Sequence, residues 1–283
     1  MVSMSADPGE VAGRRWFRTR FGRQIFIPDA HCRSMKDILK RFMSGEIDLD
    51  EAESALKRRM LRVGDCGRLD IERDARTGVP EIIIAEGKEP GQTAELVRSL
   101  YDETGFAMVT RLGQEEAEAL KATVPLEYHE KARIGVVGRR EPGRGAVGIL
   151  TAGTSDIPVA EEARVVAETL GCSTMTAYDV GVAGIHRVAS ALEEMVGRVD
   201  VLVIAAGREG ALPSVVAGLV ELPVIGVPVS TGYGAGGSGE SALLSMLQSC
   251  SPIVTVNIDA GVVAGMMAYK IARLARRDDC VST

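Results

Sequence analysis

The clearest pattern along the chain is a series of short apolar runs in its second half, each followed by a segment with apolar residues at helical spacing. The runs are rich in β-branched residues and cover residues 145–153, 172–178, 199–207, 222–230 and 252–259. Alternating strands and helices form a parallel sheet, and strands without a polar side need helices on both faces. We therefore predict an α/β fold with a doubly wound parallel sheet that binds ligands beyond the carboxyl ends of its strands.

The first half of the chain has shorter and more mixed patterns. Apolar residues at helical spacing predict a helix that ends at Gly45, and the capping-box spacing of Asp48 and Glu51 starts a second one. The apolar runs at 78–87 and 106–110 are each followed by a helical pattern. These signals predict a helical hairpin and then a small βαβα module.

A change of composition separates the two halves. Prolines, glycines and mixed charge over residues 125–144 indicate a joint between the module and the main domain. The predicted organisation is an amino-terminal tail (1–30), a small helical and α/β region (31–128), a nucleotide-binding catalytic domain (129–277) and a carboxyl-terminal tail (278–283).

Composition places the chain among globular proteins. Of its 283 residues, 46% are hydrophobic and 25% are charged, which allows a sizeable core. A net charge of -6 argues against a nucleic-acid partner, because that affinity comes from neutralising phosphates. The start of the chain lacks the apolar core of a signal peptide and no apolar run could span a bilayer. We therefore expect a cytoplasmic protein with no membrane partner.

The first predicted strand of the main domain ends in Gly153, Thr154, Ser155 and Asp156, immediately before a helix. Free backbone N–H groups and short hydroxyls at the start of a helix form a ready anion site, so a phosphate fits there. The alternative is an ordinary cap, in which Ser155 or Asp156 satisfies the first turn.

A glycine-rich stretch follows the fourth predicted strand. Residues 232–239 contain five glycines, which permit positive φ and close backbone approach to a ligand. The stretch matches neither the dinucleotide fingerprint nor a Walker loop. Phosphate or sugar binding is one interpretation, and a mobile lid is the other.

Several titratable side chains follow the predicted strands. His186 and Arg187 lie after the second strand, where a proton carrier and a phosphate partner would be useful, although a capping or buried histidine is equally open. Asp179 and Glu209 are each a general base, a metal ligand or a helix cap. Glu209 is the stronger candidate.

The five cysteines are scattered and have no C-x-x-C spacing, so neither a disulfide framework nor a zinc site is indicated. Cys250 lies between a predicted helix, limited by Pro252, and the last predicted strand. By itself it fits a buried structural thiol, since the negative end of a helix disfavours a thiolate; a cationic substrate could offset this. We expect Cys250 to lie at a turn among the glycine, histidine and carboxylate loops.

Several motifs resemble known families. GTSD before a helix, GREGALPSVVAG and LPVIGVPV are similar to the aminoimidazole ribonucleotide carboxylases and mutases of the PurE class. YDVGVAGIHR, STGYGAGGSG, LQSCSP, VNIDAG and GVPEIIIAEGK resemble the LarB family, the carboxylase/hydrolases of nickel-pincer cofactor synthesis. The likeness covers roughly residues 61–273 and implies a PurE-like, flavodoxin-like three-layer domain.

The LarB resemblance implies carboxylation of nicotinic acid adenine dinucleotide at pyridine C5 and hydrolysis of its phosphoanhydride, giving pyridinium-3,5-biscarboxylic acid mononucleotide and AMP. It also implies that Cys250 adds to C6 of the ring. A base must then remove the C5 proton, for which Glu209 is our candidate and His186 the reserve. The substrate-binding and phosphate-binding residues that we expect are Gly153, Thr154, Ser155, Asp156, Tyr178, Asp179, Arg187, Gly207, Gly232, Tyr233, Gly234, Asn257 and Asp259.

Two other functions stay open. An aminoimidazole ribonucleotide carboxylase or mutase is disfavoured, because the histidines of those enzymes are replaced here by TAYDVG and by Gly210–Ala211. A nucleotide-binding regulatory module is the alternative outside enzymes.

The expected partners are a small nucleotide substrate and CO2 or bicarbonate. Mg²⁺ would suit a pyrophosphate attacked by water, although no metal ligand is identified, and no organic cofactor is expected. The resemblance implies a homo-oligomer, an octamer. The small-residue helix at 261–275 has a smooth face that would suit packing between subunits.

Overall fold

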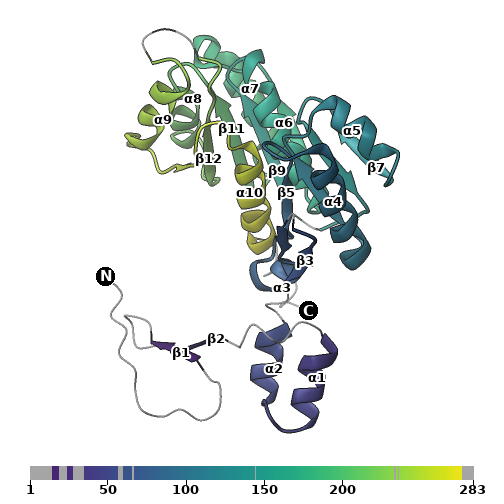
Figure 1. Cartoon of the computed structure of the whole chain (residues 1–283). Coiled ribbons are helices and arrows are strands. Elements are labelled where there is room, and N and C mark those ends of the chain that lie inside the picture. Colours follow the sequence, from purple (N-terminus) through teal and green to yellow (C-terminus); the bar gives the residue numbers. More distant parts are fainter. Residues whose placement is uncertain are drawn as a thin grey trace. The chain divides into compact units, whose positions relative to one another are not determined.

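The chain divides into two compact units, Met1–Pro80 and Glu81–Thr283, each with its own elements (Figure 1). Among the described residues no helix is both long and apolar enough to cross a lipid bilayer. The predicted tail at 278–283 lies outside them. The computed structural model describes residues 35–56, 60–65, 67–143, 145–232, 234 and 236–275, and the backbone of two strands, Arg15–Arg18 and Gln24–Ile27.

The first unit contains the predicted helical hairpin. The carboxylate of Asp48 accepts the N–H of Glu51 at 2.7 Å, and Glu51 accepts that of Asp48 at 3.1 Å, so the capping box is formed. Gly45 adopts a φ of 72°, the left-handed value expected after a helix. The elements of this unit are β1 (Arg15–Arg18), β2 (Gln24–Ile27), α1 (Met35–Met43), α2 (Leu49–Leu56), β3 (Leu61–Val63), β4 (Gly67–Leu69) and α3 (Arg73–Thr77).

The second unit begins with a four-stranded sheet in the order β5-β6-β8-β7. β5 and β6 are parallel, as in the predicted module, whereas β8 runs antiparallel to both β6 and β7. β7 and β8 therefore lie within residues 125–144, where the sequence predicts a joint. The residues of β8 are buried, so this segment is part of the sheet. The elements are β5 (Ile82–Ile84), α4 (Pro90–Thr104), β6 (Ala107–Thr110), α5 (Gln114–Lys121), β7 (Leu126–His129) and β8 (Ile134–Val137).

A five-stranded, wholly parallel sheet in the order β10-β9-β11-β12-β13 follows in the same unit. All five predicted strands are confirmed, and so is the doubly wound α/β fold. β9 and β11 are apolar almost throughout, because helices cover both of their faces. The strands are β9 (Ala146–Thr151), β10 (Ser173–Ala177), β11 (Val201–Ala206), β12 (Val224–Pro228) and β13 (Val254–Thr255).

Two groups of helices cover the five-stranded sheet (Figure 1). Residues of α7, α8 and α9 share one core cluster with β11, while α6 and α10 pack together against β9 and β11. The small-residue face of α10 is used within the chain, because a Cβ on Gly265 would lie 2.7 Å from the carbonyl oxygen of Ala163 on α6. The prediction that this face packs between subunits was therefore wrong, because the face contacts α6 of the same chain. The helices are α6 (Ile157–Thr169), α7 (Ile185–Met195), α8 (Ala211–Ala217), α9 (Glu240–Leu247) and α10 (Gly261–Ala275).

Candidate active site

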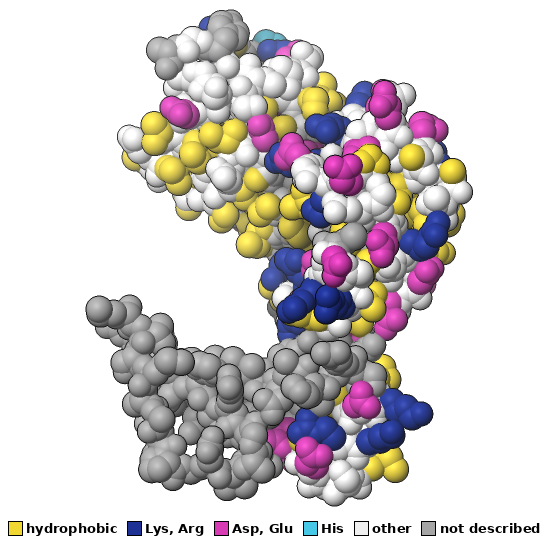
Figure 2. Space-filling model, viewed as in Figure 1, with side chains coloured by type: hydrophobic (Ala, Val, Ile, Leu, Met, Phe, Trp, Pro, Cys, Tyr) yellow, Lys and Arg dark blue, Asp and Glu magenta, His cyan; other side chains and the backbone are white. Residues whose placement is uncertain are grey.

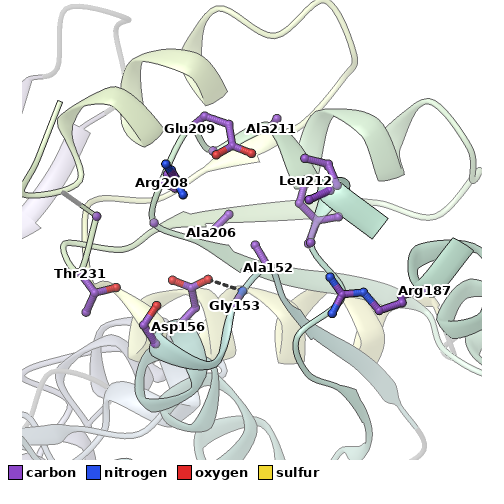
Figure 3. A pocket seen from close by; sticks show the side chains of 17 residues that line it. Ala152, Gly153, Asp156, Arg187, Ala206, Arg208, Glu209, Ala211, Leu212 and Thr231 are labelled. Atoms are coloured by element: carbon purple, nitrogen blue, oxygen red, sulfur yellow. Dashed lines mark hydrogen bonds between the residues drawn. The ribbon is translucent and has the colours of Figure 1, made fainter. Parts of the chain in front are cut away.

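A cavity of about 400 Å³ lies beyond the carboxyl ends of the parallel strands, where the fold predicts a ligand site (Figure 3). The segments that follow β9, β10, β11 and β12 all contribute to its wall. The lining residues are Ala152, Gly153, Ser155, Asp156, Gly181, Val182, Ala183, Arg187, Ala206, Gly207, Arg208, Glu209, Gly210, Ala211, Leu212, Thr231 and Gly232.

Asp156 joins three of these segments. Its carboxylate accepts the backbone N–H of Gly153 at 2.8 Å (Figure 3). Burial raises the pKa of this carboxyl group, whose residue is only 3% exposed, while hydrogen bonds from Gly153, Gly207 and Thr231 oppose the rise. Asp156 therefore fixes the segments after β9, β11 and β12 around the cavity. It is the N-cap residue of α6, but its side chain makes no cap hydrogen bond to the first turn of that helix.

The residues expected to form an anion site at the start of α6 lie only partly on the cavity wall. Gly153 and Ser155 line the cavity next to a 3₁₀ turn at Thr154–Asp156, whereas the exposed Thr154 does not line it. Backbone N–H groups at such a helix start favour an anion. The cavity can therefore hold a phosphate or carboxylate at this end.

Arg187 provides a positive charge on the opposite wall. Its guanidinium points toward the cavity from the first turn of α7 and donates to Asp179 Oδ2 at 2.9 Å (Figure 3). A Cβ on Gly184 would lie 2.7 Å from Arg187 Nε, so glycine leaves room for the side chain. Asp179 does not line the cavity and acts through Arg187. An exposed ion pair of this kind adds little stability, and its effect is to orient the arginine.

The segment after β11 forms a third wall of the cavity and contributes one positively and one negatively charged side chain to it. Arg208 and Glu209 are exposed and both line the cavity (Figure 3). The chain then turns at Gly210, whose φ is 67° and where a Cβ would lie 2.6 Å from the carbonyl oxygen of Ala242. Glu209 therefore lies where a general base could reach a ligand.

The glycine-rich stretch has a structural role as well as a place in the wall. A Cβ on Gly232 would lie 2.3 Å from the carbonyl oxygen of Gly207, so this glycine lets the segments after β11 and β12 meet. Gly232 lines the cavity and Gly234, with a φ of 95°, does not. Tyr233 lies outside the described residues.

Four other predicted residues do not line the cavity. His186 is exposed on the first turn of α7, and the hydroxyl of Tyr178 donates to Glu161 on α6. Asn257 is exposed, and Asp259 accepts the backbone N–H of Ser230 at 2.9 Å. Tyr178 and Asp259 therefore support neighbouring segments, and contact of all four residues with a ligand stays a prediction.

Cys250 lies at the opposite end of the sheet from the cavity, near the amino ends of the strands. It is exposed and precedes β13, and the pairing of Val254 with Ile225 puts this turn beside the beginning of β12. The cavity lies beyond the carboxyl ends of the strands. Within one chain, Cys250 therefore does not lie among the cavity loops, and that prediction was wrong. The prediction that Cys250 is buried was also wrong.

The acidic and metal-ligating side chains near the cavity are few. Within the described part of the chain, no three His, Cys, Asp or Glu side chains gather closely enough to hold an ion. Of the cavity carboxylates, Asp156 is already engaged by backbone N–H groups. Because Mg²⁺ commonly binds through one or two carboxylates and the phosphates of a substrate, a requirement for this ion stays a prediction.

Two protein families match successive parts of the chain. The family described as "LarB/PurE-like N-terminal domain" matches residues 61–139, and the family described as "AIR carboxylase" matches residues 146–280. The chain belongs to the LarB family. Its carboxyl-terminal domain is PurE-like, and the cavity of this LarB-family protein lies in that domain.

Individual relatives match either most of the chain or its PurE-like domain. An uncharacterised protein of Methanocaldococcus jannaschii, MJ0165, is 41% identical over 259 residues, which are 87% of this chain and 99% of that protein. The N5-carboxyaminoimidazole ribonucleotide mutase of the same organism is 36% identical over 138 residues, 47% of this chain and 82% of the mutase. The corresponding Pyrococcus horikoshii mutase is 33% identical over 132 residues, 44% of this chain and 71% of the mutase.

Solved structures give a weaker likeness. Treponema denticola PurE matches 51% of this LarB-family chain and 83% of its own chain, at 23% identity and a TM-score of 0.35.

Several cavity residues were missed from the sequence. Arg208 stands between the predicted Gly207 and Glu209, and Thr231 directly precedes the predicted Gly232, so both had a signal in their neighbours. The stretch 181–183 contains only glycine, valine and alanine, and nothing in its chemistry marks it as cavity wall.

Proposed function

We propose that this protein carboxylates nicotinic acid adenine dinucleotide at pyridine C5 with CO2 or bicarbonate and hydrolyses its phosphoanhydride, in the cytoplasm, for nickel-pincer cofactor synthesis. The products are pyridinium-3,5-biscarboxylic acid mononucleotide and AMP. The observation that carries the proposal is the cavity, which combines Arg187, Arg208 and the start of α6 with Glu209. Membership of a LarB family with a PurE-like domain supports the carboxylase class.

The charges of the cavity suit such a substrate. The dinucleotide carries a pyrophosphate and a ring carboxylate, and arginines bind both groups well through paired N–H donors. Arg187, held by Asp179, and Arg208 approach the cavity from different segments. The backbone N–H groups at the start of α6, other than that of Gly153, supply a further anion site near Ser155. An anionic nucleotide can therefore be held at several points at once.

The chemical steps need a nucleophile and a base. The Cys250 thiolate forms a bond to C6 of the cationic pyridinium ring, and an electron pair of the ring moves to make C5 nucleophilic. C5 then forms a bond to CO2. Glu209 takes the C5 proton, the sulfur–C6 bond breaks and the thiolate leaves, which restores the aromatic ring. In a separate step, water attacks the phosphoanhydride and AMP departs.

The position of Cys250 adds a requirement to this mechanism. Because Cys250 lies before β13 and Glu209 after β11, one chain does not bring them to the same substrate. We propose that a second copy brings its Cys250 to the cavity of the first, within a homo-oligomer.

The surface around Cys250 supports contact between copies. Leu219, Leu244, Leu247 and Val254 are between 49% and 64% exposed. Figure 2 shows hydrophobic side chains gathered over α9 and the segment that follows it. An apolar gathering of this kind marks an interaction surface more often than a free one. Association through this surface would bury these apolar side chains.

A direct assay tests the proposal. The purified protein is incubated with nicotinic acid adenine dinucleotide and ¹³C-bicarbonate, and the products are identified by mass spectrometry. We expect a labelled biscarboxylate mononucleotide together with AMP. Unchanged dinucleotide under conditions in which the protein is folded and oligomeric would refute the proposed reaction.

A second candidate is a mutase acting on N5-carboxyaminoimidazole ribonucleotide. The 36% identity with the Methanocaldococcus jannaschii mutase over the PurE-like domain favours it. Incubation with that ribonucleotide distinguishes the two enzymes. Binding of the dinucleotide without any product would instead favour a regulatory module.

A further inference from the structure

Glu162 lies where α6 and α10 meet the module of residues 81–139, which contains the four-stranded sheet. From α6, its Oε2 accepts the N–H of Val262 at 3.3 Å in the first turn of α10. At this point α10 is pressed against α6, because a Cβ on Gly261 would lie 2.1 Å from the carbonyl oxygen of Val159 and 2.8 Å from Glu162 Cβ. Movement of the Glu162 side chain is therefore transmitted directly to the start of α10.

The start of α10 is connected to the cavity wall. Asp259, two residues before α10 and with a φ of 55°, donates its N–H to Pro228 and accepts that of Ser230, both at 2.9 Å. Thr231, the next residue, lines the cavity and hydrogen-bonds to Asp156. The first turn of α10 therefore fixes the Ser230–Thr231 side of the cavity through Asp259.

The module of residues 81–139 approaches Glu162 from the other side with two positive charges. Arg111 follows β6 and Arg133 precedes β8, and both have a left-handed backbone, with φ of 55° and 52°. Arg133 Nη2 donates to the carbonyl oxygen of Arg111 at 3.3 Å, and Arg111 pairs with Glu86 at 2.8 Å. Strain of this kind persists only where the surrounding structure holds it. The two arginines are therefore held in fixed positions near Glu162.

Burial raises the pKa of the Glu162 carboxyl group to about 7. The N–H of Val262 and the charges of Arg111 and Arg133 favour the ionised form, whereas the negative charge of Asp259 disfavours it. If the junction opens to water, the carboxyl group returns to its ordinary acidity. The closed junction therefore binds a proton more tightly than the open one, and a rise of pH toward 7 favours opening.

We propose that Glu162 is a positioning residue that joins the module of residues 81–139 to the Ser230–Thr231 side of the cavity, and that the junction loosens when its carboxyl group ionises. This role depends on the geometry of α6, α10 and the module. It is independent of the reaction proposed above. It also gives the amino-terminal module a function, since Arg111 and Arg133 set how readily Glu162 ionises.

Hydrogen exchange of the chain without substrate tests this role. Protection factors, corrected for intrinsic exchange, are measured for peptides covering residues 226–232 and 257–265. In the wild type we expect them to fall about tenfold from pH 6 to pH 8, because ionisation in this range favours opening. Glu162→Gln keeps an acceptor for the Val262 N–H and cannot ionise, so its protection should not depend on pH.

Two further variants control the measurement. Glu168→Gln alters an exposed carboxylate on the same helix and should keep the wild-type pH dependence. Arg133→Gln removes a charge that favours ionised Glu162, so it should move the fall in protection to higher pH. Protection that is flat with pH in the wild type, or that falls equally in Glu162→Gln, contradicts the role. If Glu162→Gln does not fold, an unshifted response in Arg133→Gln contradicts it instead.

Discussion

The two ends of the strands in the five-stranded sheet differ sharply in chemistry. At the carboxyl ends, glycines, arginines and carboxylates form a cavity whose segments are held together by Asp156. Cys250 precedes β13 at the amino ends of the strands, where it is exposed and is not among the residues that line the cavity. In our proposal, the carboxyl ends of the strands hold an anionic ligand and the surface near Cys250 meets another copy of the chain. We therefore propose that a reaction using both Cys250 and the cavity takes place between two copies of the chain.

The largest effect is expected from Cys250→Ser. A serine hydroxyl is hardly ionised near neutral pH, so carboxylation should fall at least about a thousandfold. Dinucleotide affinity should stay nearly unchanged, since the cavity lies at the other end of the strands. Activity is measured by ¹³C incorporation and affinity by calorimetry.

Cys172→Ser is the matched control for this change. Burial raises the pKa of the Cys172 thiol to about 11, so it is not available as a thiolate, and carboxylation should persist. Retained carboxylation in Cys250→Ser would contradict the thiol adduct. Loss of folding in that variant would indicate a structural cysteine.

Glu209→Gln tests the base at the carboxyl ends of the strands. If Glu209 removes the C5 proton only during the reaction, turnover should fall roughly a hundredfold or more with little change in KM. His186→Gln alters an exposed side chain outside the cavity wall and provides the comparison. Wild-type turnover in Glu209→Gln would reduce Glu209 to a structural residue, and a large loss in His186→Gln would restore the histidine as base.

A smaller effect is expected where Leu247→Lys alters the apolar surface beside Cys250. Placing a charge in an apolar contact should weaken association by roughly 2 kcal/mol, or about thirtyfold. Val196→Lys replaces a similarly exposed residue after α7 and should leave association unchanged. Light scattering over a dilution series measures both. A wild type that stays monomeric at micromolar concentration would exclude a site shared between copies.

The five parallel strands and much of the cavity could be predicted from the sequence for one reason. The carboxyl ends of parallel strands lie at the same end of the sheet, so Gly153, Arg187 and Glu209 could be predicted from the sequence to lie close together. Arg208 and Thr231 depend on how each segment curves, which Asp156 and the glycine contacts decide. Long-range contacts of this kind leave no local pattern.

Two other features were misread for physical reasons. Strands β7 and β8 are only four residues each, and β7 is half exposed, so the prolines and charges around them resemble a joint. The smooth face of α10 indicates close packing correctly, but a single sequence does not say whether the partner helix belongs to the same chain. Here the partner is α6.

Mixed oligomers of the two catalytic variants test the central claim most directly. Cys250→Ser and Glu209→Gln chains carrying different tags are co-expressed, and oligomers containing both are purified and assayed for carboxylation. If each site combines Cys250 of one copy with Glu209 of another, random mixing should restore about a quarter of wild-type activity, although each variant alone is inactive. Mixed oligomers no more active than the separate variants would contradict a shared site.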